Sequence, residues 1–271
     1  MKLSCTSIMV PGATFTEKAN NLKKWGYDGI GVFVDYPDWN EELEQEILHL
    51  EENTGVHVCE FMFSGDDYGH LMNPDEKLSQ ATLKMYKDAA KMVAKLGNCI
   101  SELEYTLGER KELPLFDIYM KMNAEESAEF KKKYAEIAAE VDGVEGAYVL
   151  LEPCNRYETP YLNNADDCAQ VLKEMNMDEN VGLLCDTFHL NFEEKDLAAK
   201  IREYGNIIKY VHLGDNNRLM PGNGSIDWKE IIGALKEVGF DGYMSFECST
   251  GFTSPEKALK QGAEFIRQYI G

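Results

Sequence analysis

Apolar, strand-like segments and helix-like segments alternate eight times along the 271 residues of this chain. The strand-like runs are short and rich in Val, Ile, Leu, Phe or Cys, and they cover 2–9, 28–34, 55–63, 98–103, 147–152, 181–186, 207–213 and 243–247. The helix-like segments cover 15–25, 40–53, 75–96, 124–142, 165–176, 194–204, 227–238 and 255–269. Eight strand–helix pairs in a chain of this length predict an α/β protein built as a single (β/α)8 TIM barrel.

An open, doubly wound α/β sheet is the alternative fold. Its nucleotide-binding versions are disfavoured, because no GxGxxG or GxxxxGK(S/T) stretch follows an early strand. No linker, low-complexity tract or charge block divides the chain, so we expect one domain over 1–271. The long connection is 104–123, which follows the fourth strand on the side where barrel active sites form.

The charge balance narrows the classes of partner. With 27 basic and 48 acidic residues the formal net charge is -21, which disfavours binding to nucleic acid or to anionic membranes. No apolar run reaches the ~18 residues that a membrane span needs. The seven cysteines form no CxxC pair and several lie in strand-like runs, as expected for buried thiols in a reducing cytoplasm.

Charged or imidazole side chains end four consecutive strand-like runs. They are Glu152 in AYVLLEP, Asp186 in VGLLCD, His212 in IIKYVHLGD and Glu247 in GYMSFEC. In a barrel these ends converge around one mouth, where three carboxylates would repel one another unless a cation lay between them. Three oxygen donors and one nitrogen suit Mn²⁺, Mg²⁺ or Co²⁺, and Zn²⁺ is a further alternative.

Each of these residues has a simpler explanation when it is taken alone. An aspartate at a strand end often caps the next helix, and a histidine in a strand is often a satisfied core residue. Glutamate is both a poor strand former and a poor cap, so strand-end glutamates are harder to dismiss. Four such residues in register favour the metal site.

Polar residues also follow these strand ends and would surround the same mouth. Such a rim suits the hydroxyl groups of a carbohydrate, although Arg156 could equally form a structural salt bridge. Gly222 and Gly224 are expected to shape a turn rather than to bind phosphate. The rim residues are Asn155, Arg156, Glu158, His189, Asp215 and Arg218.

The stretches LEPCNRYET, CDTFHLN and HLGDNNRLMPGNGSIDWKEIIGALKEVGFDGYMSFE resemble the ketose 3-epimerases of the D-tagatose/D-psicose type, within the xylose-isomerase-like TIM barrels. The resemblance is dense over 147–250 and thin before that. It departs at Ile100–Glu104, which lacks the usual glycine–proline stretch, and at Asp215, where glutamate is common. These departures leave the substrate open.

The resemblance implies a role for each site residue. Glu152, Asp186, His212 and Glu247 would hold one divalent metal ion, most often Mn²⁺. Glu152 and Glu247 would also be the catalytic acid/base pair. The substrate-binding residues Glu158, His189 and Arg218 would contact the sugar hydroxyls.

The reaction expected is proton transfer next to a ketone through an enediolate, with the cation as Lewis acid. Removal and return of the proton on opposite faces gives ketose 3-epimerisation, and return to the neighbouring carbon gives aldose–ketose isomerisation. Without a clear phosphate-binding loop, an unphosphorylated sugar is expected. The partner is then a small-molecule sugar, and a homo-oligomer stays open.

Three other functions stay open. The first is a hydroxypyruvate- or inosose-type isomerase, which would use the same metal and glutamates. The second is a catalytically silent sugar-binding barrel. The third is a metal-dependent hydrolase like the AP endonucleases, which is disfavoured because a three-metal site needs more histidines than the five present and because of the negative charge.

Overall fold

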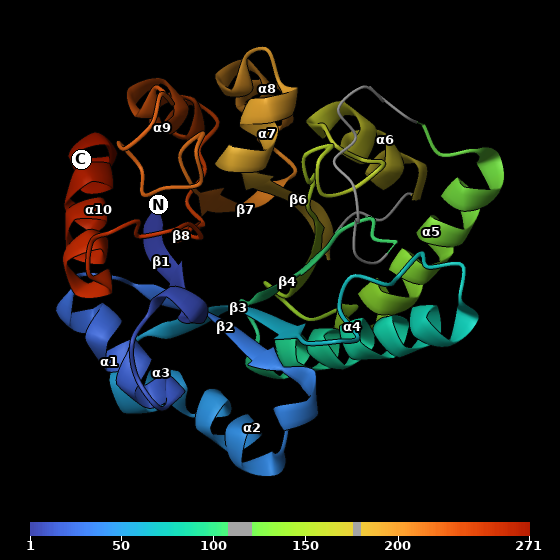
Figure 1. Cartoon of the computed structure of the whole chain (residues 1–271), viewed down its shortest axis with the longest axis horizontal. Coiled ribbons are helices and arrows are strands. Elements are labelled where there is room, and N and C mark those ends of the chain that lie inside the picture. Colours follow the sequence, from blue (N-terminus) through green and yellow to red (C-terminus); the bar gives the residue numbers. More distant parts are fainter. Residues whose placement is uncertain (108–120, 176–179) are drawn as a thin grey trace.

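Eight parallel strands close into a barrel in the order of the sequence (Figure 1). The computed structural model describes residues 1–107, 121–175 and 180–271. The strands are β1 (Lys2–Thr6), β2 (Gly29–Asp35), β3 (His57–Ser64), β4 (Ile100–Leu103), β5 (Tyr148–Leu151), β6 (Val181–Asp186), β7 (Ile208–Leu213) and β8 (Tyr243–Phe246). Pairing of β1 with β8 closes the barrel, which confirms the predicted fold and excludes the doubly wound open sheet.

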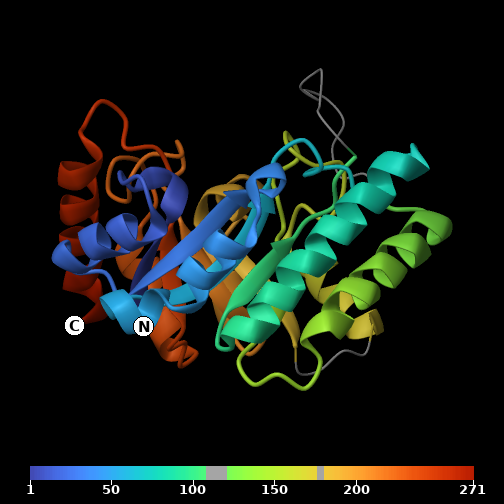
Figure 2. The same ribbon diagram turned by 90° about the horizontal axis from the view of Figure 1, so that it is seen from below.

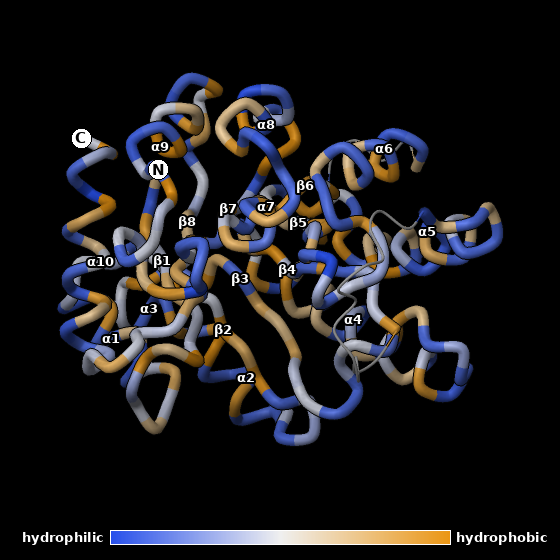
Figure 3. Tube along the Cα trace, turned by 45° about the horizontal axis from the view of Figure 1, so that its top comes forward, coloured by the Kyte–Doolittle hydropathy of each residue, from blue (hydrophilic) through white to orange (hydrophobic). Residues whose placement is uncertain are grey.

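Helices surround the barrel and bury their apolar faces against it (Figure 2). They are α1 (Phe15–Lys24), α2 (Glu41–Leu48), α3 (Leu50–Thr54), α4 (Glu76–Leu96), α5 (Ala124–Ala138), α6 (Ala165–Met175), α7 (Thr187–Glu193), α8 (Leu197–Tyr204), α9 (Trp228–Glu237) and α10 (Pro255–Ile270). The hydropathy colouring in Figure 3 shows apolar strands at the centre and hydrophilic stretches on the outer helices. Within the described residues, no helix combines the length and apolar character needed to cross a membrane.

Two predicted elements differ in the structure. The helix expected over 40–53 is interrupted at His49, which leaves the helical region at the end of α2 (φ -100, ψ 7). The first strand ends at Thr6, and a 3-10 turn covers Ser7–Met9. Most of the expected connection 104–123 lies outside the described residues, which omit 108–120.

An additional helix, α7, begins directly after β6, where the sequence predicted no helix before residue 194. The Oδ1 atom of Asp186 accepts hydrogen bonds from the backbone N–H groups of Phe188 and His189 and so caps α7. These bonds satisfy two of the N–H groups that a helix start leaves unpaired. The helix therefore starts at the strand end itself and holds His189 beside the barrel mouth.

The alternation of side chains along a strand places the site on top of a packed layer. Cys59, Ile100, Leu150, Leu184 and Tyr210, from five adjacent strands, form a buried cluster. In the last four of these strands, the residues two positions further on face the same way, because successive side chains point to opposite faces of a strand. Two positions after Ile100, Leu150, Leu184 and Tyr210 come Glu102, Glu152, Asp186 and His212.

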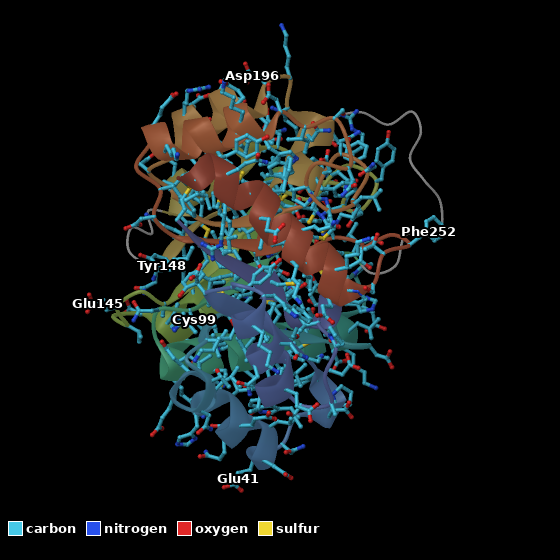
Figure 4. The ribbon with its side chains drawn as sticks, turned by 90° about the vertical axis from the view of Figure 1, so that its left-hand side faces the viewer. Glu41, Cys99, Glu145, Tyr148, Asp196 and Phe252 are labelled. Carbon is cyan, nitrogen blue, oxygen red and sulfur yellow. The ribbon has the colours of Figure 1, made fainter. Side chains whose placement is uncertain are left out.

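The two ends of the barrel differ in what surrounds them. Figure 4 shows Phe252 projecting from the loop after β8 on one side, and Glu145 and Tyr148 at the start of β5 on the other. The four predicted metal ligands lie toward the carboxyl ends of their strands, the end that bears the Phe252 loop.

Candidate metal centre and active site

The four residues predicted to share a metal ion lie together. Asp186 pairs with His212 between β6 and β7, while Glu152 and Glu247 each follow the last residue of their strand. Measured from Nδ1 of His212, the carboxylate oxygens lie at 3.6 Å for Glu152, 3.8 Å for Asp186 and 3.3 Å for Glu247. One ligand atom from each of the four lies within 4.8 Å of all the others.

Within the part of the chain that the structure describes, two buried atoms of this cluster lack a hydrogen-bond partner, as expected for ligands of a cation. Oε1 of Glu152 and Nδ1 of His212 are buried and have no hydrogen-bond partner among the described residues. A buried polar atom without a partner costs free energy, on the order of 1–3 kcal/mol, unless something else satisfies it. Both atoms face the same small volume, and oxygen and imidazole donors suit a divalent ion.

Arg218 reaches into the cluster from the loop after β7. Its Nη1 donates to Oδ2 of Asp186 at 2.7 Å, and its Nη2 donates to Oε2 of Glu247 at 2.5 Å. The guanidinium lies over the ring of Phe188, 4.6 Å from the centroid, a cation–π geometry. The backbone of Arg218 has φ of 57°, a conformation that non-glycine residues adopt rarely and that is enriched at functional sites.

The two oxygens of Asp186 have separate partners. Oδ1 caps α7, and Oδ2 faces Arg218 and the imidazole of His212. Burial would raise the pKa of Asp186, but Arg218 and the nearby histidines outweigh burial and hold the pKa below its usual value. One fully buried side chain therefore both caps α7 and forms part of the charged cluster.

Burial and mutual charge perturb the other ligands. Burial raises the pKa of the Glu152 carboxyl to about 7. Burial acts to lower the pKa of His212, but Glu247 and Glu60 overcome it and raise that pKa well above its usual value. Strong perturbation of several neighbouring groups is typical of functional sites.

The predicted substrate contacts His189 and Glu158 lie beside the cluster. Nδ1 of His189 accepts hydrogen bonds from the backbone N–H and the side-chain amide of Asn155, at 3.2 and 2.8 Å. In a neutral ring the proton is then on Nε2, which lies 3.9 Å from Oδ2 of Asp186. The amide of Asn155 also donates to Glu158, whose side chain is 53% exposed and so accessible to a ligand.

Two other rim residues are structural. Arg156 forms an ion pair with Glu193, with Nη2 2.5 Å from Oε2, as the salt-bridge alternative predicted. Asp215 is fully buried and organises the loop after β7: its Oδ2 accepts from the indole N–H of Trp228 at 2.9 Å and from the backbone of Gly222. Asp215 therefore shapes the loop that carries Arg218.

Two buried glutamates next to His212 were missed by the sequence analysis. Glu60 of β3 has Oε1 2.8 Å from Nε2 of His212, and Glu102 of β4 has Oε2 3.8 Å from the same nitrogen. Burial and the neighbouring Glu152 raise the pKa of Glu102 well above its usual value. A signal was present, since glutamate in the middle of an apolar strand is unfavourable unless it has a partner.

Fold and site together define an eight-stranded α/β barrel with a buried carboxylate–histidine cluster at the carboxyl ends of its strands. Residues 19–269 match the Xylose isomerase-like TIM barrel family, and the chain belongs to that family.

Curated relatives and a solved structure agree with this assignment. The chain is 38% identical over 118 residues to a ketose 3-epimerase of Arthrobacter globiformis, covering 43% of this chain and 40% of that protein. It is 31% identical over 179 residues to a D-psicose 3-epimerase of Ruminiclostridium cellulolyticum, covering 66% and 59%. The crystal structure of D-psicose 3-epimerase with D-tagatose from Clostridium cellulolyticum H10 superposes with a TM-score of 0.81, at 21% identity, over 100% of this chain and 99% of that one. These two alignments thus span about half of the curated relatives' lengths.

Proposed function

We propose that this protein is a divalent-metal-dependent isomerase of small, unphosphorylated sugars that catalyses ketose 3-epimerisation, with Mn²⁺ as the preferred ion. One observation carries the proposal: Glu152, which follows β5, and Glu247, which follows β8, both approach Nδ1 of His212, at 3.6 and 3.3 Å. The names of the ketose 3-epimerase relatives support the substrate class. The proposal includes a cytoplasmic location and no nucleic-acid or membrane partner, which the free thiols and the net charge of -21 support.

Glu152, Asp186, His212 and Glu247 would hold the metal ion. When bound, a divalent cation supplies Lewis acidity, which makes it easier to remove a proton from a carbon next to a ketone. Glu152 and Glu247 would remove this proton and return one to the carbon. Without a metal ion, burial raises the pKa of Glu152 to about 7, and a general acid or base works best with a pKa near the working pH.

The presence of two glutamates at the ends of separate strands, β5 and β8, favours epimerisation. If one glutamate takes the proton from one face of the carbon and the other returns a proton to the opposite face, the centre is inverted. Arg218, His189 and Glu158 would contact the sugar hydroxyls and fix which carbon lies between the two carboxylates. Positioning of this kind accounts for much of the rate of such reactions.

The test is incubation of ketohexoses with the Mn²⁺-loaded protein in D₂O, scoring product and deuterium together. The proposal expects the 3-epimer with deuterium at C3. Deuterated aldose would indicate aldose–ketose isomerisation, and conversion of hydroxypyruvate alone would indicate the smaller-substrate isomerase. Sugar binding without deuterium uptake would reject catalysis, and cleavage of a phosphodiester would indicate the hydrolase.

The variant Glu247→Gln tests whether Glu247 takes part in proton transfer, because it removes the carboxylate and keeps the size of the side chain. We expect turnover to fall by at least ~10²-fold, the usual contribution of a general acid or base, while some Mn²⁺ still binds. Glu264→Gln is the matched control, because Glu264 is exposed on α10, outside the barrel. Normal turnover by Glu247→Gln would refute the two-glutamate mechanism.

A further inference from the structure

We propose that Glu60 is a positioning residue that holds the proton of the His212 imidazole on Nε2, so that the Nδ1 lone pair faces the three carboxylates. The proposal rests on the proposed metal centre and assigns a role to a residue outside it. Glu60 comes from β3, in the first half of the chain.

Buried hydrogen bonds hold Glu60 beside His212. Its Oε1 lies 2.8 Å from Nε2 of His212, and both side chains are fully buried. Its Oε2 accepts a hydrogen bond from the hydroxyl of Tyr210 at 3.3 Å. The Tyr210 hydroxyl also lies within hydrogen-bonding distance of Ser4 and Cys59. These contacts hold the hydroxyl in place, and the hydroxyl in turn holds the Glu60 carboxylate.

The neighbouring strand leaves room for this carboxylate. A Cβ atom on Gly31 of β2 would lie 2.2 Å from Oε2 of Glu60, closer than any real contact, so a side chain there would displace the carboxylate from its present position. The register of β2 and β3 shifts between Ile30 and Gly31, which pairs Gly31 with Glu60. This irregularity lets the consecutive residues Cys59 and Glu60 both reach Tyr210, in keeping with the way bulges re-aim side chains.

A hydrogen bond at one ring nitrogen decides the state of the other. An anionic carboxylate can only accept, so in a neutral ring the proton shared with Glu60 is on Nε2 and Nδ1 has a free lone pair. Nδ1 is the nitrogen that lies 3.3–3.8 Å from Glu152, Asp186 and Glu247 and has no hydrogen-bond partner among the described residues. Carboxylates behind a metal-binding histidine act in this way, and their loss typically weakens metal binding ~10–100-fold.

The same observations argue against a second ion among Glu60, Glu102 and His212, although their ligand atoms lie within 4.8 Å of one another. An ion there would need Nε2 without its proton, while the first ion needs Nδ1 without one. Glu102 instead provides a matched control. It is the same residue type and lies 3.8 Å from Nε2, with an Oε2 that makes no hydrogen bond among the described residues.

The experiment measures Mn²⁺ affinity by calorimetric titration for the wild type, Glu60→Gln and Glu102→Gln, without substrate. We expect a ~10–100-fold loss for Glu60→Gln, as for other partners of metal-binding histidines, and a clearly smaller loss for Glu102→Gln. Equal losses would overturn the proposal, because they would mean that the close contact of Glu60 with Nε2 has no effect beyond that of a nearby glutamate. Absence of Mn²⁺ binding by the wild type would remove the metal centre and this inference together.

A second measurement needs no Glu60 variant. The wild type is labelled with ¹⁵N-histidine and loaded with diamagnetic Zn²⁺, and the His212 signal is identified by its loss in His212→Gln. We expect a proton on Nε2 and none on Nδ1, and a proton on Nδ1 would refute the proposal. Failure of epimerisation with these results intact would overturn the proposed function and leave the role of Glu60 standing.

Discussion

Replacement of Asp186 tests whether one buried carboxylate both caps α7 and binds metal. Asn keeps the side-chain oxygen that accepts from Phe188 and His189 but loses the charge facing Arg218, whereas Ala loses both. Loss of an N-cap costs ~1 kcal/mol. For a domain of this size that lowers Tm by ~2–4 °C. Metal-free Asp186→Ala should therefore melt a few degrees below Asp186→Asn.

The metal response of the same two variants should be alike. At 100 times Kd a bound ion stabilises the wild type by ~2.7 kcal/mol, and each tenfold loss of affinity removes ~1.4 kcal/mol of this. Both variants should then show a much smaller rise in Tm with Mn²⁺ than the wild type. The assay is thermal unfolding with chelator and with added Mn²⁺. Equal metal-free Tm values would refute the capping role, and an undiminished metal-induced shift would refute the ligand role.

Three further outcomes are expected. Mn²⁺ at 100 times Kd should raise the Tm of the wild type by ~5–10 °C and chelator should reverse this, and an unchanged Tm would argue against the centre. Trp228→Phe should lower the free energy of unfolding by ~1–3 kcal/mol in urea titrations, because Asp215 loses a buried hydrogen bond and keeps those from Gly222 and other backbone N–H groups. Burial by itself raises the pKa of Asp88, but its partners, led by Lys84, lower it to about 2, below its value in the unfolded chain. Ionised Asp88 therefore stabilises the fold above pH ~4, and this stabilisation is lost as the pH falls to ~2. In urea titrations, Asp88→Asn should be less stable than the wild type at pH 6 and equal to it near pH 2. A difference that stays constant with pH would contradict this.

The fold could be predicted from the sequence because each strand is marked locally. Short apolar runs separated by amphipathic helices specify parallel strands buried on both faces, and eight of them close a barrel. The ends of helices were harder to predict where a side-chain cap sets them. The helix α7 was missed because its start depends on Oδ1 of Asp186 turning back to the backbone at Phe188 and His189.

The juxtaposition of Glu152, Asp186, His212 and Glu247 could also be predicted, because strand ends of a barrel meet at one mouth. Their roles as metal ligands and bases remain predictions. Arg218 was expected at this mouth, but its ion pairs with Asp186 and Glu247 could not be foreseen, because they depend on a left-handed backbone conformation in a loop that Asp215 organises.

By itself the sequence determined the barrel and the four strand ends that share its mouth, since both follow from periodicity along the chain. Only the tertiary structure decided what lies behind His212. Glu60 is 152 residues away in sequence and meets the imidazole across the barrel, where Gly31 leaves space for the carboxylate. No local pattern encodes that contact, because it depends on the register of β2 against β3 and on closure of the barrel, which brings β3 opposite β7.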